Sequence, residues 1–459
     1  MIKRVMIAAP KSGSGKTSVT LALLSSLKKQ NKKTVSFKCG PDYIDPLFHK
    51  RVLGIESFNL DTFFTDEDTT RSLFDNDSAG YDYAVIEGVM GLFDGLGGIK
   101  EEGSSYHLAQ VLKAPIVLVV DAKGMGKSVT ALIKGYQNYD KDNLIKGVIL
   151  NRVSSSFYKI IAPVIEEENG ISVLGFIPEQ KDVNISSRHL GLVTPNDIEN
   201  INDVIERLRS EFDANVSQDL FEKIFDDSEK TEYKTEEIKE SKTEGSDSKS
   251  DCVIAVAKDD AFCFLYEDNI KELKKHGASI KYFSPIKDDS IPNDADALLL
   301  PGGYPELHLE ELSSNKSMMQ SIKDAYTNKM PMVAECGGFM YLHNSIRDKD
   351  GKTFETAGII DGECTYTGKS VRFGYIEVRE KKSSFLNENE YIKGHEFHYY
   401  DSTKNGDSCI AGKPVTKKEY DCVIEGENFW LGFPHLYYPS APSFAENFVK
   451  KACEYKRLK

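Results

Sequence analysis

The chain has 459 residues, of which 40% are hydrophobic and 28% charged, and its formal net charge at pH 7 is −14. This length predicts two or three domains, and the acidic balance argues against a general nucleic-acid binder, which needs surplus cations to displace counterions. The longest apolar runs, such as 116–120, are too short to cross a bilayer. With no recognisable signal peptide, we expect a cytoplasmic protein without a membrane partner.

The first half alternates short apolar segments with longer ones of helical character. The apolar segments are rich in β-branched residues, as expected for parallel strands buried on both faces. We predict strands at 5–9, 34–38, 83–87, 116–121, 147–151 and 173–177, and helices between them that include 16–30 and 127–139. The alternation predicts an α/β fold built on a doubly wound parallel sheet.

Residues 226–251 have the composition of a linker. They include ten acidic residues and five lysines, but only two large apolar side chains, Tyr233 and Ile238. Such a segment buries too little apolar surface to offset the entropy lost on ordering. We therefore predict an acidic flexible linker that separates a domain at 1–225 from a second domain at 252–459.

The second half begins with the same alternation. We predict strands at 252–257, 279–283, 297–300, 331–334 and 428–431, helices at 261–275 and 444–457, and a β-rich region at 352–399. This pattern predicts a second α/β domain.

A loop of small residues follows the first predicted strand and leads directly into a helix. It reads Pro10-Lys11-Ser12-Gly13-Ser14-Gly15-Lys16-Thr17, with Pro10 where the strict phosphate-loop pattern has glycine. The backbone N–H groups of such a loop face phosphate oxygens, and the helix N-terminus adds positive charge. Lys16 would reach the β- and γ-phosphates of a nucleotide, and Thr17 would bind Mg²⁺ through its hydroxyl.

Two other positions could belong to this site. Lys11 stands where deviant phosphate loops of the partitioning-ATPase and dethiobiotin-synthetase superfamily have an extra lysine, although a solvated loop lysine is an equal alternative. Asn151-Arg152 and Pro178-Glu179 stand at the ends of two later predicted strands and could frame the nucleotide base, and loop capping accounts for them equally well.

Acidic side chains follow two successive predicted strands. Ligands of a doubly wound sheet bind at the carboxyl ends of its strands, so these acids should converge on Lys16. Carboxylates beside a triphosphate bind Mg²⁺ or orient a substrate. The predicted site residues are Asp42, Tyr43, Asp45, Glu87 and Asp94, of which Asp45 and Glu87 are candidate metal ligands with Thr17.

Cys336 is the candidate nucleophile among eight cysteines that form no CxxC pair. It follows a predicted strand and precedes a helix, so we expect an exposed elbow and a thiol whose pKa is lowered by the helix N-terminus. The glycines of Pro301-Gly302-Gly303 end another strand and can present N–H groups as an oxyanion hole. His435, near the C-terminus, is the candidate base.

Over essentially its full length the chain resembles the cobyrinic acid a,c-diamide synthase family. The resemblance rests on the deviant phosphate loop and on the motifs GPDYIDP, EGVMGLFDG, PGGYPE, ECGGFMYL and GHEFHYY. The first half is similar to dethiobiotin synthetase, and the second half is similar to class I glutamine amidotransferases.

The resemblance implies a carbon–nitrogen ligase whose substrates are ATP, L-glutamine and a tetrapyrrole carboxylate, with Mg²⁺ as cofactor. It implies that Cys336 and His435 release ammonia from glutamine while N–H groups near Gly303 and Gly337 hold the oxyanion. Ammonia would then displace phosphate from an activated carboxylate, on the a and c acetate chains in turn. A homodimer is left open.

One departure concerns the residue two positions after the histidine, where class I amidotransferases usually have glutamate and this chain has Tyr437. The resemblance therefore leaves open whether another group orients His435 or whether Cys336 and His435 act as a dyad. The segment 394–399 could face the tetrapyrrole or the domain interface, or form a packed β-hairpin.

Three alternatives remain at this point. Nickel-sirohydrochlorin a,c-diamide synthase has the same architecture and motifs. Cobyric acid synthase amidates other side chains, but GPDYIDP and EGVMGLFDG favour the a,c enzyme. A partitioning-type ATPase switch would explain the phosphate loop but not the glutaminase half.

Overall fold

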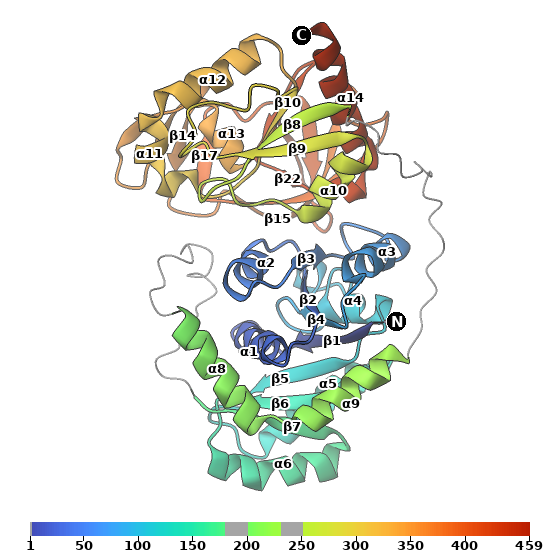
Figure 1. The fold of residues 1–459 in the computed structure, drawn as a ribbon. Coiled ribbons are helices and arrows are strands. Elements are labelled where there is room, and N and C mark those ends of the chain that lie inside the picture. Colours follow the sequence, from blue (N-terminus) through green and yellow to red (C-terminus); the bar gives the residue numbers. More distant parts are fainter. Residues whose placement is uncertain (1, 180–200, 231–250) are drawn as a thin grey trace. The chain divides into compact units, whose positions relative to one another are not determined.

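The computed structural model describes residues 2–179, 201–230 and 251–459, which form two compact units (Figure 1). We call residues 2–179 with 201–230 the N-terminal unit, and residues 251–459 the C-terminal unit. Residues 231–250, most of the predicted linker, lie outside the described residues. None of the described helices combines the length and apolar character that a bilayer span requires.

The N-terminal unit is built on a parallel sheet with the strand order β3-β2-β4-β1-β5-β6-β7. The strands are β1 (Lys3–Ala8), β2 (Thr34–Cys39), β3 (Ser57–Leu60), β4 (Tyr83–Glu87), β5 (Ile116–Asp121), β6 (Ile145–Asn151) and β7 (Ser172–Ile177). Successive residues of one strand pack into different cores, Val5 and Ile7 on one face and Met6 and Ala8 on the other. The predicted doubly wound α/β fold is confirmed.

Helices cover both faces of this sheet (Figure 1). The helices are α1 (Lys16–Lys29), α2 (Ile44–Phe48), α3 (Glu67–Ser78), α4 (Ser105–Val111), α5 (Ser128–Tyr139), α6 (Ser155–Asn169), α8 (Ile201–Asn215) and α9 (Gln218–Glu229). Helices α1, α8 and α9 contribute to one core, and α3 to α6 contribute to the other.

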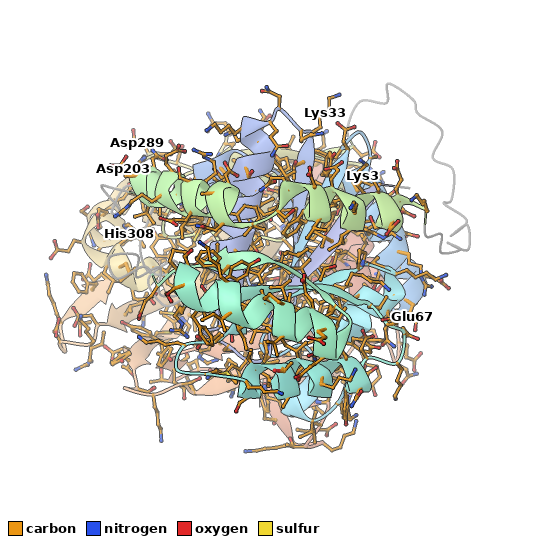
Figure 2. All side chains as sticks on the ribbon, turned by 90° about the horizontal axis from the view of Figure 1, so that it is seen from below. Lys3, Lys33, Glu67, Asp203, Asp289 and His308 are labelled. Carbon is orange, nitrogen blue, oxygen red and sulfur yellow. The ribbon has the colours of Figure 1, made fainter. Side chains whose placement is uncertain are left out.

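The structure differs from the sequence prediction at two places in this unit. Strand β3 was missed, because its four residues alternate polar and apolar side chains at the sheet edge. The start of the predicted linker is helical, since α9 extends to Glu229. Lys3, labelled in Figure 2, pairs with Glu222 and Asp226 of this helix, with both nitrogen–oxygen distances at 2.7 Å.

The C-terminal unit has a central sheet with the strand order β20-β21-β11-β10-β8-β9, in which only β20 is antiparallel to its neighbour. Its strands are β8 (Cys252–Ala257), β9 (Ala278–Phe283), β10 (Ala297–Leu300), β11 (Met332–Glu335), β20 (Ile424–Glu425) and β21 (Phe429–Gly432). The helices are α10 (Glu267–Lys275), α11 (Leu309–Ser314), α12 (Lys316–Thr327), α13 (Gly337–Tyr341) and α14 (Pro442–Leu458).

Two smaller sheets account for the predicted β-rich region. One has the order β13-β12-β14-β17 and the other β19-β18-β15-β16-β22. The strands are β12 (His343–Arg347), β13 (Thr353–Glu355), β14 (Ile360–Tyr366), β15 (Arg372–Glu380), β16 (Ile392–His398), β17 (Tyr400–Ser402), β18 (Cys409–Gly412), β19 (Glu419–Cys422) and β22 (His435–Leu436). The helix predicted at 261–275 begins only at Glu267, because the carboxylate of Asp259 accepts the N–H groups of Ala261 and Phe262 in a turn.

Candidate active sites

The phosphate loop joins β1 to α1 in a conformation that needs glycine. Gly13 has φ 75° and Gly15 has φ 102°, in the left-handed region that other residues rarely adopt. A Cβ on Gly15 would lie 2.2 Å from Asn151 Nδ2, which donates a hydrogen bond to Ser14 O at 2.8 Å. Asn151 therefore contacts the loop itself, and strand β6 holds the loop in place.

Lys16 and Thr17 reach the end of β4, as the prediction required. Lys16 Nζ donates to Met90 O at 2.6 Å, and the Thr17 hydroxyl donates to Glu87 Oε1 at 2.7 Å. Burial, with the nearby charge of Lys38 adding to it, lowers the pKa of Lys16 to about 8. The loop and the motif at 87–95 thus form one site.

Lys38, which the sequence analysis did not single out, is the central cation of this site. Its ammonium pairs with Asp45 and lies 3.0 Å from Glu87 Oε1, and all three side chains are buried. Burial alone would lower the pKa of Lys38, but the carboxylates of Asp45 and Glu87 outweigh it and raise this pKa. The same ammonium holds the pKa of Asp45 below its usual value despite burial.

The other predicted acids lie in the loops beside this cluster. Asp42 Oδ1 accepts the Ile44 N–H at 2.8 Å, and Asp94 Oδ2 accepts the Gly91 N–H at 3.0 Å. Burial and the charge of Asp45 raise the pKa of Asp42 to about 6. Tyr43 is buried, and Lys11 is exposed.

The oxygen atoms beside the loop suit Mg²⁺. Glu87 Oε2 is buried and has no hydrogen bond among the described residues, and it lies 3.6 Å from His49 Nε2. No group of three or more His, Cys, Asp or Glu in the described part of the chain is arranged to hold a metal alone. Mg²⁺ would therefore draw most of its ligands from phosphate and water, as it usually does, and Thr17, Asp45 and Glu87 fit that role.

Cys336 occupies the predicted elbow between β11 and α13, but the residue is only 5% exposed, so the prediction of an exposed elbow is wrong. Its φ of 44° and ψ of −101° place a non-glycine residue in strained backbone, which is typical of functional sites. The prediction that its pKa falls is wrong. Burial, with the charges of Glu306 and Glu396 adding to it, raises the pKa of the thiol well above its usual value. The resting group is therefore a thiol, and attack requires a base that removes its proton.

His435 and the two glycines of the predicted oxyanion hole lie beside this elbow. Glu335 pairs with Gly432 across β11 and β21, so Cys336 and His435 both follow the carboxyl ends of neighbouring parallel strands. A Cβ on Gly302 would lie 2.2 Å from His435 Cε1, and a Cβ on Gly337 would lie 3.0 Å from Gly303 N. The loop at 302–303 thus contacts both the histidine and the residue after the nucleophile.

The segment that carries His435 is fixed by helix α10. Asn269 Nδ2 donates to Leu436 O and Asn269 Oδ1 accepts the Tyr438 N–H, both at 2.8 Å. The Tyr437 hydroxyl, at the position where glutamate was expected, donates to Asp268 Oδ2 at 2.9 Å. Burial lowers the pKa of His435 well below its usual value, so the resting imidazole is neutral.

The segment 394–399 forms part of a packed antiparallel pair of strands, β15 and β16. Glu396 is fully buried, pairs with Arg372 at 3.4 Å, and accepts a hydrogen bond from the Tyr420 hydroxyl. His395 and His398 are also buried. Among the alternatives for this segment, the described contacts are those of a packed β-structure.

Two family models match the chain: the CobQ/CobB/MinD/ParA nucleotide binding domain over residues 5–193 and the CobB/CobQ-like glutamine amidotransferase domain over residues 253–440. A cobyrinate a,c-diamide synthase from Caldanaerobacter subterraneus subsp. tengcongensis is 36% identical over 463 residues, which cover 100% of both chains. The chain belongs to the cobyrinate a,c-diamide synthase family.

Relatives from distant organisms agree with this assignment. The cobyrinate a,c-diamide synthase of Fusobacterium nucleatum is 37% identical over 97% of this chain and 99% of its own. That of Picrophilus torridus is 37% identical over 98% of both chains. The family resemblance is confirmed, and the chain is a ligase with a nucleotide-binding domain and a glutamine amidotransferase domain.

Proposed function

We propose that this chain is a cobyrinate a,c-diamide synthase, which uses ATP and ammonia from glutamine to amidate the a and c acetate side chains of cobyrinate. The observation that carries the proposal is the presence of two sites in one chain, each in its own unit. A phosphate cradle with buried carboxylates supports activation of an acid, and a cysteine elbow beside a neutral histidine supports release of ammonia. The choice of cobyrinate as the substrate is supported by the relatives, which are named cobyrinate a,c-diamide synthases.

In the glutaminase reaction, Cys336 Sγ attacks the carboxamide carbon of glutamine while His435 takes the thiol proton. A C–S bond forms, and the N–H groups of Gly303 and Gly337 stabilise the oxyanion. His435 then gives the proton to the departing nitrogen, the C–N bond breaks and ammonia leaves. Water attacks the thioester and releases glutamate and the thiol.

In the ligase reaction, an acetate oxygen of the substrate attacks the γ-phosphorus of ATP, which yields ADP and an acyl phosphate. Ammonia attacks the carbonyl carbon, phosphate leaves, and the amide remains. Residues 12–17 hold the phosphates, assisted by Lys11 at the start of the loop and by Asn151, which donates a hydrogen bond to Ser14 O. Asp42, Tyr43 and Asp94 face the substrate and nucleotide. Thr17, Asp45 and Glu87 would hold Mg²⁺, which when bound would neutralise phosphate charge.

We assign the ligase reaction to the N-terminal unit, whose helix α9 runs to Glu229, past the boundary predicted at 225. We assign the glutaminase reaction to the C-terminal unit, with the acidic segment between the two units as the linker. This division predicts that the two chemistries can be separated by mutation. A cytoplasmic location agrees with substrates that are all small metabolites.

The test is an assay of the full chain with ATP, Mg²⁺ and glutamine on cobyrinate and on nickel-sirohydrochlorin, with products read by mass. We expect two successive amidations of cobyrinate. Amidation of nickel-sirohydrochlorin but not of cobyrinate would refute the proposal that cobyrinate is the substrate. Cys336→Ser should lose activity with glutamine and keep activity with ammonium salt. Loss with both nitrogen sources would refute the division of labour.

A further inference from the structure

The imidazole of His435 stacks on that of His395. The ring centroids are 4.9 Å apart and the planes differ by 14°. The two residues face each other in the register of β16 and β22, so the backbone pairing itself brings the rings together. Both side chains are buried.

His395 is in turn held by its own neighbours. The Tyr266 hydroxyl lies 3.4 Å from His395 Nδ1, and the Tyr266 ring packs edge-on against Tyr437 with centroids 5.2 Å apart. Burial, with the charge of Lys413 adding to it, lowers the pKa of His395 to about 3. The two stacked imidazoles are therefore both neutral, and the stack carries no charge repulsion.

The other sides of His435 leave its ring little room. A Cβ on Gly302 would lie 2.2 Å from His435 Cε1, so the loop backbone lies against the ring edge. The centroid of the Phe264 ring is 6.1 Å from that of His435. These contacts, together with the stack, limit how the imidazole can turn.

A histidine that acts as a base needs an orienting group. In this chain the residue two positions after His435 directs its hydroxyl to Asp268 at 2.9 Å. We propose that His395 is the positioning residue of His435, and that its stacked ring holds the imidazole in the orientation that serves Cys336. The inference rests on the proposed glutaminase reaction and extends it to a residue outside the reacting pair.

The test compares variants that remove the ring with one that keeps it. His395→Leu and His395→Asn remove the stacking surface, and His395→Phe keeps it without the ring nitrogens. Because small misplacements of a reacting group cost up to about 100-fold in rate, we expect kcat for glutamine hydrolysis to fall roughly 10- to 100-fold in the ring-free variants. The KM for glutamine should stay close to that of the wild type.

The aromatic variant should recover most of the lost kcat. Phe397→Leu, at an exposed position of the same strand, is the matched control and should leave kcat unchanged. Synthesis with ammonium salt should stay at the wild-type rate in every variant, since it does not use His435.

Three results would overturn the inference: wild-type kcat in either ring-free variant, a kcat for His395→Phe as low as for His395→Leu, or a rise in KM that matches the fall in kcat. If the wild-type chain releases no more ammonia from glutamine than Cys336→Ser does, the proposed function itself fails, and the two failures are thereby distinguished.

Discussion

The buried cation of the N-terminal unit offers the sharpest test of the site. Lys38 pairs with Asp45 and Glu87, and the side chains of the three residues are 6%, 7% and 0% exposed. The substitution Lys38→Met keeps most of the side-chain length and removes the charge. Two buried carboxylates would then lack their cation, so we expect a large loss of stability in addition to loss of synthetase activity.

The magnitude follows from the burial of the pair. Removing one partner of a buried ion pair costs about 3–5 kcal/mol, and a unit of this size loses roughly 2–4 °C of Tm per kcal/mol. We therefore expect a fall in Tm of about 6–20 °C. Burial raises the pKa of Glu87 to about 7 even though Lys38 lowers it. Without Lys38 this pKa rises further, so protonation of Glu87 should reduce the loss at and below neutral pH.

The assay is scanning calorimetry of the full chain above and below pH 7, in which two units can unfold in separate transitions. Only the transition of the N-terminal unit should move. Lys33→Met, at an exposed position labelled in Figure 2, is the matched control and should change Tm little. Adding Glu87→Gln to Lys38→Met should recover part of the loss. A Tm for Lys38→Met equal to that of the control would refute the reasoning.

Three other outcomes are expected. Lys16→Ala should abolish synthesis with glutamine or ammonium salt while glutamine hydrolysis partly survives, and full synthesis with ammonium salt would contradict the phosphate-loop assignment. Tyr437→Phe loses a hydrogen bond to Asp268 and should cost about 1–3 kcal/mol in urea unfolding, with kcat for glutamine hydrolysis nearly unchanged. Burial raises the pKa of Glu335 from 4.5 to about 8, so the folded chain binds more protons and stability falls as pH rises between these values. Glu335→Gln should make that slope shallower, while Glu306 and Glu425, whose pKa values burial also raises, keep the rest of it.

The sequence predicted the strands that are buried on both faces, because a continuous apolar run needs no knowledge of its partners. Strand β3 was not predicted, because Ser57 and Asn59 are polar and interrupt the apolar run. They lie in a strand because β3 pairs with β2, and this pairing is not visible in the local sequence. Helix α10 begins later than predicted because the carboxylate of Asp259 holds a turn at 259–262. The spacing of apolar residues does not predict such a turn.

In the two sites, too, the sequence predicted what local motifs determine and not what depends on residues far along the chain. Lys16, Thr17, Glu87 and Cys336 stand in local motifs. The structure brings Lys16 and Thr17 to the segment at 87–90 and places Cys336 at a strand–helix elbow. The predicted direction of the pKa shift of Cys336 was wrong, because burial of the thiol raises its pKa by more than the N-terminus of α13 lowers it. Lys38 and His395 were not selected, since each gains its role from residues far along the chain. A lysine at the carboxyl end of a buried strand was a usable signal for Lys38.

The hydrogen bond from Asn151 to Ser14 O should affect the rate at which nucleotide binds. A cradle whose backbone is already held by strand β6 need not rearrange when a nucleotide collides with it. Association is slowed when binding must wait for a conformational change, so a preformed cradle favours rapid capture. Releasing the loop by Asn151→Ala should therefore slow nucleotide association more than it speeds dissociation.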